Sequence, residues 1–283
     1  MKLSVVMPAK NEESTVGETI RRLYQWQPEL EVLVVDDGSS DRTGEIAAAA
    51  GALVLSHPYS KGNGAAIKTG ARAANGEVIV FLDADGQHDP ADIPRLLERI
   101  EAGHDMVVGA RQKGSQASVG RALANAFYNR LASWMIGHSV EDLTSGFRAV
   151  RADKFREFLY LMPNGFSYPT TSTMAFFRAG YSVAYLQINA AQRRGQSHIH
   201  PFRDGARFLL IIFKVGTLFS PLKIFAPIAL SLFVLASAWY GWTWWQQGRL
   251  TNMSTLLYSG SVMVFLMGLI SEQITALMYR GRD

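Results

Sequence analysis

Two long apolar stretches near the end of the chain constrain the fold most strongly. Ile224–Trp245 carries no charged residue, and neither does Met253–Ser271, after which the apolar pattern continues to Tyr279. A helix needs about 20 apolar residues to cross a hydrocarbon core about 30 Å thick. Only the short polar segment 246–249 (QQGR) separates the two stretches. The sequence therefore predicts a transmembrane helical hairpin that returns the chain to the side from which it entered.

Charges around the hairpin predict its orientation. The connection between the stretches contains only Arg249, whereas several basic residues lie outside them: Arg203, Arg207, Lys214, Lys223, Arg280 and Arg282. Positive charge favours the cytoplasmic side of a membrane, and the cluster Trp239–Trp245 at the far end is typical of an aromatic belt. The apolar run at the N-terminus, Leu3–Met7, is too short for a signal peptide. We therefore expect a multi-pass protein of the inner (plasma) membrane whose N-terminal part is cytoplasmic.

The part of the chain before the hairpin alternates between strand and helix patterns. Its expected strands are Leu3–Met7, Val32–Val35, Val78–Leu82 and Asp105–Ala110. Its clearest helices are Ser14–Trp26, a helix capped by Ser40 and Asp41 that runs to Ala50 and is stopped by Gly51, a helix with Asp89 as N-cap and Pro90 at its first position, and Val119–Ile136. Continuous apolar strands that alternate with helices predict a mostly parallel sheet covered on both faces. About 200 residues are enough for one such domain, and the absence of cysteine excludes disulfides and thiolate metal sites.

Between this domain and the hairpin, Pro201–Phe219 has a helical pattern. At about 100° per residue, its basic residues Arg203, Arg207 and Lys214 fall within a narrow arc, and most of the rest is Phe, Leu and Ile. Such a helix is expected to lie on an anionic membrane surface; the alternative is a buried helix with one solvated edge. The expected organisation is a catalytic domain at 1–200, an amphipathic interfacial helix at 201–221 and a transmembrane hairpin at 222–283.

Two carboxylates at the end of a predicted strand indicate a metal site. Asp83 and Asp85 are two residues apart after Val78–Leu82, so both side chains can face one cleft. In such sheets, ligands bind beyond the carboxyl ends of the strands. Together with the diphosphate of a nucleotide, the two carboxylates can hold Mg²⁺ or Mn²⁺, and Gln87 can add an amide oxygen. The metal would neutralise charge on a departing nucleoside diphosphate.

Five ordered motifs carry a resemblance to a known family: Pro8–Glu13 (PAKNEE), Val35–Thr43 (VDDGSSDRT), Asp83–His88 (DADGQH), Thr144–Arg148 (TSGFR) preceded by Asp142, and Gly195–Ser197 (GQS). The chain resembles the family 2 glycosyltransferases, and within them the polyprenyl-phosphate glycosyltransferases, the group that includes dolichyl-phosphate mannose synthases. The resemblance covers essentially the whole chain. It implies a GT-A fold, that is, an α/β Rossmann-like catalytic domain, here followed by an interfacial helix and a two-helix transmembrane hairpin. It also implies a nucleotide-sugar donor linked to UDP or GDP, a divalent metal, Mg²⁺ or Mn²⁺, and a polyprenyl phosphate acceptor such as undecaprenyl or dolichyl phosphate.

Carried over by position, the resemblance assigns roles to individual residues. Pro8, Glu12 and Asp37 would hold the base and ribose; a turn acid before Gly38 is the alternative for Asp37. Asp83, Asp85 and Gln87 would form the metal site. Arg111 and Arg121 match basic positions that grip the acceptor phosphate, and the alternative for each is a surface charge. Asp142 matches a carboxylate near the reaction centre, where it would act with Asp85 in catalysis; a helix cap or an ion-pair partner of Arg148 are its alternatives.

The last motif departs from the family pattern. The family often has an arginine three residues before the glycine and a lysine after the serine, where this chain has Gln192 and His198. Arg193 and Arg194 are then the candidates for holding the diphosphate, together with Ser197. His198 would either donate to a phosphate or lie on the surface.

These observations predict an inverting, metal-dependent hexosyltransferase that moves a sugar from a nucleotide sugar to a polyprenyl phosphate at the cytoplasmic membrane face. Alternatives are transfer to another membrane lipid such as diacylglycerol, and a catalytically silent nucleotide-sugar-binding membrane subunit. We expect no nucleic-acid partner and leave the oligomeric state open, with a homo-oligomer as one option. The sugar, the base and the prenyl chain length are not specified by the sequence.

Overall fold

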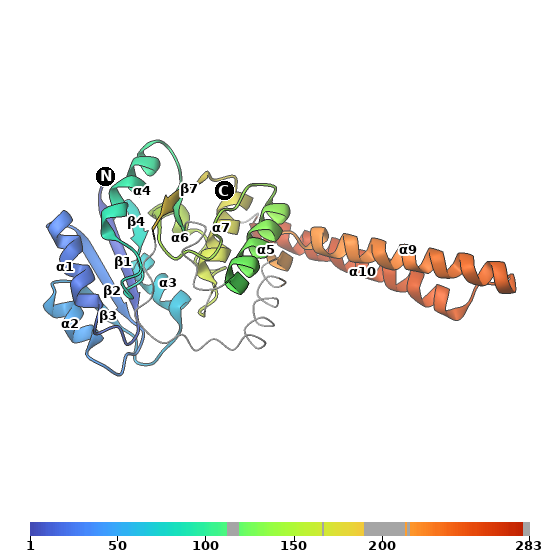
Figure 1. The fold of residues 1–283 in the computed structure, drawn as a ribbon, viewed down its shortest axis with the longest axis horizontal. Helices are drawn as coiled ribbons and strands as arrows, with labels where there is room; N and C mark the ends of the chain where they lie inside the picture. Colours follow the sequence, from blue (N-terminus) through green and yellow to red (C-terminus); the bar gives the residue numbers. More distant parts are fainter. Residues whose placement is uncertain (112–118, 166, 190–212, 214–215, 280–283) are drawn as a thin grey trace. The chain divides into compact units, whose positions relative to one another are not determined.

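The computed structural model describes residues 1–111, 119–165, 167–189, 213 and 216–279, without the side chains of 119–125, 278 and 279. The chain forms two compact units (Figure 1). The first comprises Met1–Trp134 and His138–Ile199, and the second comprises Met135–Gly137 and His200–Asp283.

A seven-stranded sheet in the order β3-β2-β1-β4-β6-β5-β7 forms the centre of the first unit. Its strands are β1 Leu3–Ala9, β2 Glu31–Asp36, β3 Leu53–Ser56, β4 Val78–Phe81, β5 Met106–Arg111, β6 Arg148–Arg151 and β7 Val183–Ile188. β1 pairs in parallel with β2 and β4, β2 with β3, and β5 with β7, whereas β6 is antiparallel to both β4 and β5. The predicted mostly parallel sheet is therefore confirmed, and β6 is an exception that the sequence patterns did not predict.

Helices cover both faces of this sheet (Figure 1). They are α1 Val16–Trp26, α2 Thr43–Ala49, α3 Asn63–Ala73, η1 Pro90–Asp92, α4 Ile93–Glu101, α6 Ala152–Arg156 and α7 Tyr168–Arg178. One further helix, α5 Val119–Ile136, lies between β5 and β6 in the sequence. Alternate strand residues such as Val5 and Val34 pack in one buried cluster with apolar residues of α1 and α4. The intervening residues face α3, α6 and α7; Phe81, for example, lies with its ring centroid 4.7 Å from that of Phe155.

Local signals for helix ends agree closely with the structure. The Asp89 side chain accepts a hydrogen bond from the backbone N–H of Ala91, as expected for a cap before Pro90. Gly51 adopts a left-handed φ of 97° just beyond α2, where the sequence placed the helix stop. The start of α2 differs slightly, because Arg42 occupies its N-cap position, although Asp41 still accepts from the N–H of Thr43 at 3.0 Å.

The second unit contains the hairpin. Its helices are α9 Pro221–Gln247 and α10 Asn252–Tyr279, joined where Gly248 adopts a left-handed φ of 62°. Three hydrogen bonds fix their antiparallel register: Leu222 N–H to Glu272 Oε2 at 3.2 Å, Ser261 Oγ to Ala229 O at 2.8 Å, and Tyr258 Oη to Ser237 Oγ at 3.0 Å.

The outer surface of the hairpin is apolar. Both helices are long and apolar enough to cross a membrane, and most of their side chains are exposed within the described chain, Trp245 at 90%. A helix in the core of a soluble protein would bury such a surface, so these exposed apolar faces match lipid contact. Of the predicted interfacial helix at Pro201–Phe219, only Phe213 and residues 216–219 are described, and these are helical; the rest lies outside the described residues.

Close packing of α3 on the sheet yields a first prediction. An added Cβ on Gly70 would lie 2.3 Å from Val6 Cγ1 and 3.2 Å from Val35 Cγ2. Gly70→Ala gains about 1 kcal/mol of helix propensity, but overpacking of a rigid core costs about 1–3 kcal/mol. We therefore expect a lower midpoint of thermal unfolding than in the wild type, whereas Gly165→Ala, which meets no atom within 4 Å, should be neutral. A Gly70→Ala protein as stable as the wild type would contradict this packing.

Candidate active site

Four motif segments meet at one edge of the sheet. β1, β2, β4 and β5 end there with Ala9, Asp36, Phe81 and Arg111, and antiparallel β6 begins there with Arg148. Parallel strands place their carboxyl ends together, and antiparallel β6 adds its amino end. The topology thus brings 8–13, 35–43, 83–88 and 142–148 to a common site, although the last segment follows the others by more than 50 residues.

The segment after β1 connects the second and third motifs. Asn11, in a left-handed conformation with φ of 55°, accepts from the backbone N–H of Ser40 at 2.9 Å. The N–H of Glu12 donates to Thr43 Oγ1 at 2.8 Å. On the other side, the buried Thr15 hydroxyl donates to the carbonyl of Ala84 at 2.7 Å. The same hydroxyl lies 3.4 Å from Glu12 Oε2, so Thr15 holds Glu12 near the Asp83–Asp85 segment. Pro8 is buried in β1.

Asp37 is buried and binds a neighbouring loop. Its carboxylate accepts hydrogen bonds from His57 Nδ1 at 2.7 Å and from Ser60 Oγ and the N–H groups of Lys61 and Gly62, each at 2.8 Å. Burial alone would raise the pKa of Asp37, but these four donors outweigh it and lower the pKa. The carboxylate thus holds the loop 57–62 beside the end of β2, and its own oxygens are occupied by that loop.

Asp83 and Asp85 are both half-buried at the end of β4, and Gln87 is half-buried beside them. The N–H of Gln87 donates to Asp85 Oδ1 at 3.1 Å. A Cβ added to Gly146 would lie 2.7 Å from Asp83 Oδ2, so the absence of a side chain there leaves room for this carboxylate. Two carboxylates and an amide oxygen are a donor set that suits Mg²⁺ or Mn²⁺. Within the described residues no group of three or more His, Asp or Glu side chains could hold a metal.

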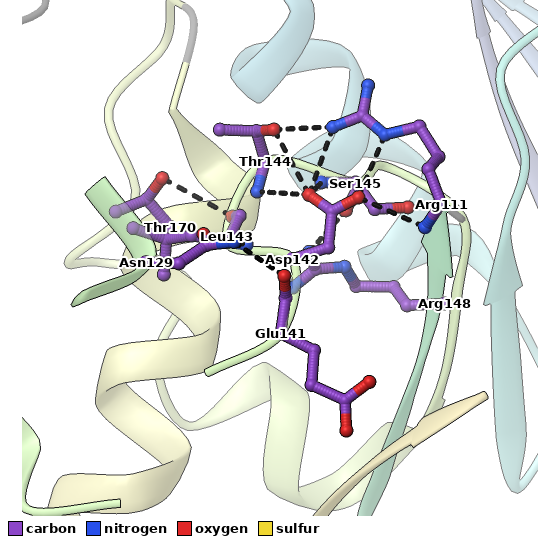
Figure 2. Close-up of polar contacts among 9 residues, drawn as sticks. All are labelled: Arg111, Asn129, Glu141, Asp142, Leu143, Thr144, Ser145, Arg148 and Thr170. Atoms are coloured by element: carbon purple, nitrogen blue, oxygen red, sulfur yellow. Dashed lines mark hydrogen bonds and ion pairs between the residues drawn. The ribbon is translucent and has the colours of Figure 1, made fainter. Parts of the chain in front are cut away.

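Arg111 and Asp142 form a two-pronged ion pair in the same site (Figure 2). Arg111 Nε donates to Asp142 Oδ2 at 2.8 Å and Nη2 donates to Oδ1 at 3.0 Å. Asp142 is 6% exposed and accepts further bonds from the N–H groups of Arg111, Thr144 and Ser145 and from the Thr144 hydroxyl. Burial would raise the pKa of Asp142, but hydrogen bonds and the charge of Arg111 lower it. The pKa of Arg111 is raised in turn, because its bonds to Asp142 outweigh desolvation.

The loop that carries Asp142 is anchored from two further sides, and Figure 2 shows the one formed by Asn129. From α5, Asn129 donates to the carbonyl of Glu141 and accepts from the N–H of Leu143 at 3.1 Å. From β7, Gln187 Nε2 donates to the Glu141 carboxylate at 2.6 Å. Because elements on several sides of the loop hold it, the position of Asp142 relative to β5 is well defined.

Arg148 is fully buried and does not pair with Asp142. Its Nη1 donates to the carbonyl of Pro169 and the hydroxyls of Ser172 and Thr173 at 2.8–3.0 Å, and its Nη2 donates to the carbonyl of Ser145. The alternative interpretation of Asp142 as the ion-pair partner of Arg148 is therefore wrong. Geometry explains this outcome, because Arg148 lies in β6 with its guanidinium directed at α7, while Arg111 ends the adjacent β5.

His88 joins the third and fourth motifs. Its buried ring stacks on Phe147 with centroids 5.1 Å apart and planes 18° apart. Burial, together with the positive charge of Arg111, lowers the pKa of His88 to about 4, so its imidazole is neutral at pH 7. The sequence patterns did not single out His88, Thr15, Gly146 or Tyr168; of these, only Gly146 and His88 fall within the motifs.

Several predicted site residues are not located by the structure. Arg121 lies on α5, but its side chain is among those not described. The remaining phosphate-binding candidates lie outside the described residues: Arg193, Arg194, Ser197 and His198. The structure thus brings together Pro8, Glu12, Asp37, Asp83, Asp85, Gln87, Arg111 and Asp142, most of which come from four separate motifs.

Family comparisons agree with this arrangement. Residues 4–159 match the model described as glycosyl transferase family 2, and residues 220–277 match the one described as the GtrB C-terminal hairpin. The chain is 32% identical over 216 residues to a dolichyl-phosphate hexose transferase of Haloferax volcanii, a match that covers 75% of this chain and 93% of that protein. It is 31% identical over 210 residues to an undecaprenyl-phosphate mannosyltransferase of Micrococcus luteus, covering 68% and 85%.

A third relative extends well beyond the match. The chain is 37% identical over 162 residues to an undecaprenyl-phosphate 4-deoxy-4-formamido-L-arabinose transferase of Photorhabdus laumondii, a match that covers 53% of this chain and 49% of that protein. The aligned part thus spans about half the length of that relative.

Solved structures share the fold of the first unit. A glucosyl-3-phosphoglycerate synthase of Mycobacterium tuberculosis, crystallised with Mn²⁺, uridine diphosphate and phosphoglyceric acid, gives a TM-score of 0.55 at 27% identity, covering 69% of this chain and 72% of that one. The same enzyme with Mg²⁺ and uridine diphosphate gives a TM-score of 0.56 at 25% identity, covering 69% and 72%. The predicted GT-A fold is thereby confirmed.

The Asp37 network yields a second prediction, on stability and pH. The folded-state pKa of Asp37 is depressed. The ionised Asp37 side chain therefore stabilises the folded state fully above the unfolded pKa of about 3.9, and this stabilisation is lost as the pH falls through the lower folded-state pKa. Asp37→Asn should cost roughly 1.5–3 kcal/mol at pH 7, because an amide NH₂ meets donors where a carboxylate accepted them. It should also show a smaller loss of stability in acid than the wild type.

Thermal unfolding of both proteins between pH 3 and 7 measures these differences. The exposed Asp153 offers a matched control, since Asp153→Asn should change stability by less than about 0.5 kcal/mol. Equal midpoints at pH 7 for Asp37→Asn and Asp153→Asn would contradict the role of Asp37 in holding the loop.

Proposed function

The chain belongs to glycosyl transferase family 2, and we propose that it transfers a sugar, with inversion at C1, from a nucleotide-sugar donor to a polyprenyl phosphate at a membrane surface. One observation carries this proposal: Asp83, at the end of β4, lies beside Gly146 in the loop that carries Asp142, and Asp142 pairs with Arg111 at the end of β5. A site with acidic groups on one side and a fixed arginine on the other suits two phosphate substrates, one bound through a metal and the other bound directly.

On the donor side, we propose that Asp83 and Asp85, with Gln87, hold Mg²⁺ or Mn²⁺ against the diphosphate. When bound, the metal supplies charge neutralisation for the departing nucleoside diphosphate. Support comes from the fit of the donor set and from the Mn²⁺ and Mg²⁺ complexes of the similar synthase with uridine diphosphate. Pro8 and Glu12 would contact the nucleoside, and Asp37 would shape its pocket through the loop 57–62. Uracil and guanine remain alternative bases.

On the acceptor side, we propose that Arg111 binds the lipid phosphate. Two of its guanidinium nitrogens are engaged by Asp142 and Thr144, whereas Nη1 has no hydrogen-bond partner within the part of the chain that is described (Figure 2). A guanidinium held rigidly on one edge can present its other edge to phosphate oxygens without loss of further side-chain freedom. Arg121, Arg193, Arg194, Ser197 and His198 remain candidates for additional phosphate contacts.

We propose that Asp142 acts by orienting Arg111 and not as a general base. Its oxygens already accept six hydrogen bonds, and its pKa is lowered, so it is a poor proton acceptor at neutral pH. The chemistry does not require a base, because the acceptor phosphate is already anionic at pH 7. One of its oxygens attacks C1 of the sugar as the bond from C1 to the diphosphate oxygen breaks. Positioning and electrostatic stabilisation would then supply most of the rate enhancement.

The membrane part of the proposal rests on the hairpin. The match of residues 220–277 to the GtrB C-terminal hairpin and the exposed apolar faces of α9 and α10 support a membrane anchor. We propose that both ends of the hairpin are cytoplasmic, as the basic residues outside it indicate, in the inner (plasma) membrane. The division into a catalytic domain at 1–200, an interfacial helix at 201–221 and a hairpin at 222–283 is part of the same proposal.

A donor screen tests the proposed function. Membranes that contain undecaprenyl or dolichyl phosphate are incubated with the purified protein, Mn²⁺ and individual UDP- and GDP-sugars, and the lipid product is identified by mass. A glycosylated polyprenyl phosphate is the expected product. Transfer to diacylglycerol in place of the polyprenyl phosphate, or no transfer from any donor, would contradict the proposal.

A third prediction concerns the metal carboxylates. Asp85→Ala should abolish transfer with little effect on thermal stability, because it removes a ligand from the half-buried metal site and not from the core. A chelator should abolish wild-type transfer, and added Mg²⁺ or Mn²⁺ should restore it. As a control, Asp153→Ala removes an exposed carboxylate on α6 and should leave transfer unchanged. Full activity of Asp85→Ala, or of the wild type in chelator, would rule out the metal assignment.

A fourth prediction concerns the anchor. A chain truncated after Ser220 should still bind the donor nucleotide, since the proposed nucleotide site is built from strand ends before Gln87. Transfer to a long polyprenyl phosphate in membranes should fall sharply, because the anchor raises the effective concentration of enzyme at the surface. Transfer to a short, water-soluble prenyl phosphate should fall much less. Equal losses with the two acceptors would show that the tail contributes to the active site itself.

A further inference from the structure

We propose that Gly146 and Tyr168 are positioning residues for the metal carboxylate Asp83. The point that a Gly146 Cβ would occupy lies 2.7 Å from Asp83 Oδ2 and 3.1 Å from Tyr168 Oη. The carboxylate and the phenol therefore approach the same bare backbone position. This inference rests on the proposed function, because it assigns two further residues to the metal site on which that function depends.

Tyr168 is held firmly in this place. It is 3% exposed, and its hydroxyl donates to the carbonyl of Gly146 at 2.9 Å. Its ring centroid lies 6.0 Å from that of Phe81, the last residue of β4, and 5.7 Å from the Arg148 guanidinium carbon. Ser167, directly before it, has a φ of 105°, a left-handed conformation that a serine adopts only under constraint from its surroundings. The backbone is thus strained at the residue that directs Tyr168 toward Asp83.

Arg148 connects Tyr168 to the loop that contains Gly146. Through Nη1 it binds the first turn of α7, at the carbonyl of Pro169 and the hydroxyl of Ser172, and through Nη2 it binds the carbonyl of Ser145. These bonds of Arg148 and the bond from Tyr168 to Gly146 together fix α7 against residues 145 and 146. The loop therefore cannot move away from Asp83 without breaking contacts of a fully buried cation, which is costly.

This arrangement predicts that metal binding through Asp83 depends on Gly146 and Tyr168. Groups behind a metal ligand restrict its orientation, and their loss typically weakens metal binding about 10- to 100-fold. The same loop carries Asp142, whose carboxylate accepts from the Ser145 N–H at 3.1 Å. Gly146 and Tyr168 would thus set the position of the metal carboxylate relative to the Arg111–Asp142 pair.

A metal-binding measurement tests this proposal. Binding of Mn²⁺ to the full-length protein is followed by electron paramagnetic resonance in the presence of saturating UDP or GDP, whichever supports binding by the wild type. Tyr168→Phe removes one hydroxyl and keeps the ring, and we expect Mn²⁺ binding about tenfold weaker or worse. Tyr181→Phe is the matched control. The hydroxyl of Tyr181 donates to Glu157 at 2.9 Å, away from Asp83 and Asp85, and its loss should leave Mn²⁺ binding unchanged.

A second pair of variants keeps the test independent of folding losses. Gly146→Ala should weaken Mn²⁺ binding because its methyl group displaces Asp83, whereas Gly165→Ala, with no atom within 4 Å, should not. Wild-type Mn²⁺ affinity in both Tyr168→Phe and Gly146→Ala would overturn the inference while leaving the proposed function intact. A wild-type protein that binds no Mn²⁺ with either nucleotide would overturn the metal-dependent function and the inference together.

Discussion

The buried ion pair between Arg111 and Asp142 is the interaction on which the arrangement of the site depends. A carboxylate that is 6% exposed must be compensated, and here six hydrogen bonds compensate it. Removing one partner of such a pair typically costs about 3–5 kcal/mol, because the other charge is left buried. The pair therefore fixes the end of β5 to the loop before β6, and it keeps Asp142 ionised and occupied.

This constraint separates the roles of the acidic residues in the site. Asp142 is surrounded by donors and has a lowered pKa, which suits the orientation of an arginine. Asp83 and Asp85 lie half-buried at a strand end, which suits metal binding. Asp37 is occupied by the loop 57–62. Acidic motifs that look alike in the sequence, each near a strand end, thus have different electrostatic environments.

Much of the fold could be predicted from local patterns. The spans matched α9 and α10 because twenty or more apolar residues without charge have few alternatives, and Asp89-Pro90 and Gly51 marked helix ends through backbone chemistry that is local. Antiparallel β6 was not predicted, since its four residues begin with a buried arginine and carry no strand periodicity. Contacts between segments that lie far apart in the chain could not be predicted from the sequence either. Nothing local shows that Tyr168 reaches Gly146, or that Asp142 pairs with Arg111 in preference to Arg148.

In the hairpin, too, some features follow from the local sequence and others depend on contacts between distant residues. Its length and apolar character follow from composition, whereas its register depends on individual polar contacts such as Glu272 with the Leu222 N–H. A carboxylate near the first turn of a helix is favoured by the helix dipole. The polar residues within the spans therefore serve to align the two helices, which the apolar surface alone would leave free to slide.

The central claim is that Asp142 acts through Arg111, and a double-mutant cycle tests it most directly. kcat/KM for a short polyprenyl phosphate is measured for the wild type, Arg111→Ala, Asp142→Ala and the double variant at saturating donor. If Asp142 serves only to orient Arg111, the double variant should be no worse than Arg111→Ala, with a coupling free energy of about 1–3 kcal/mol. If the two losses instead add within about 0.5 kcal/mol, Asp142 acts independently of Arg111, and its orienting role is contradicted.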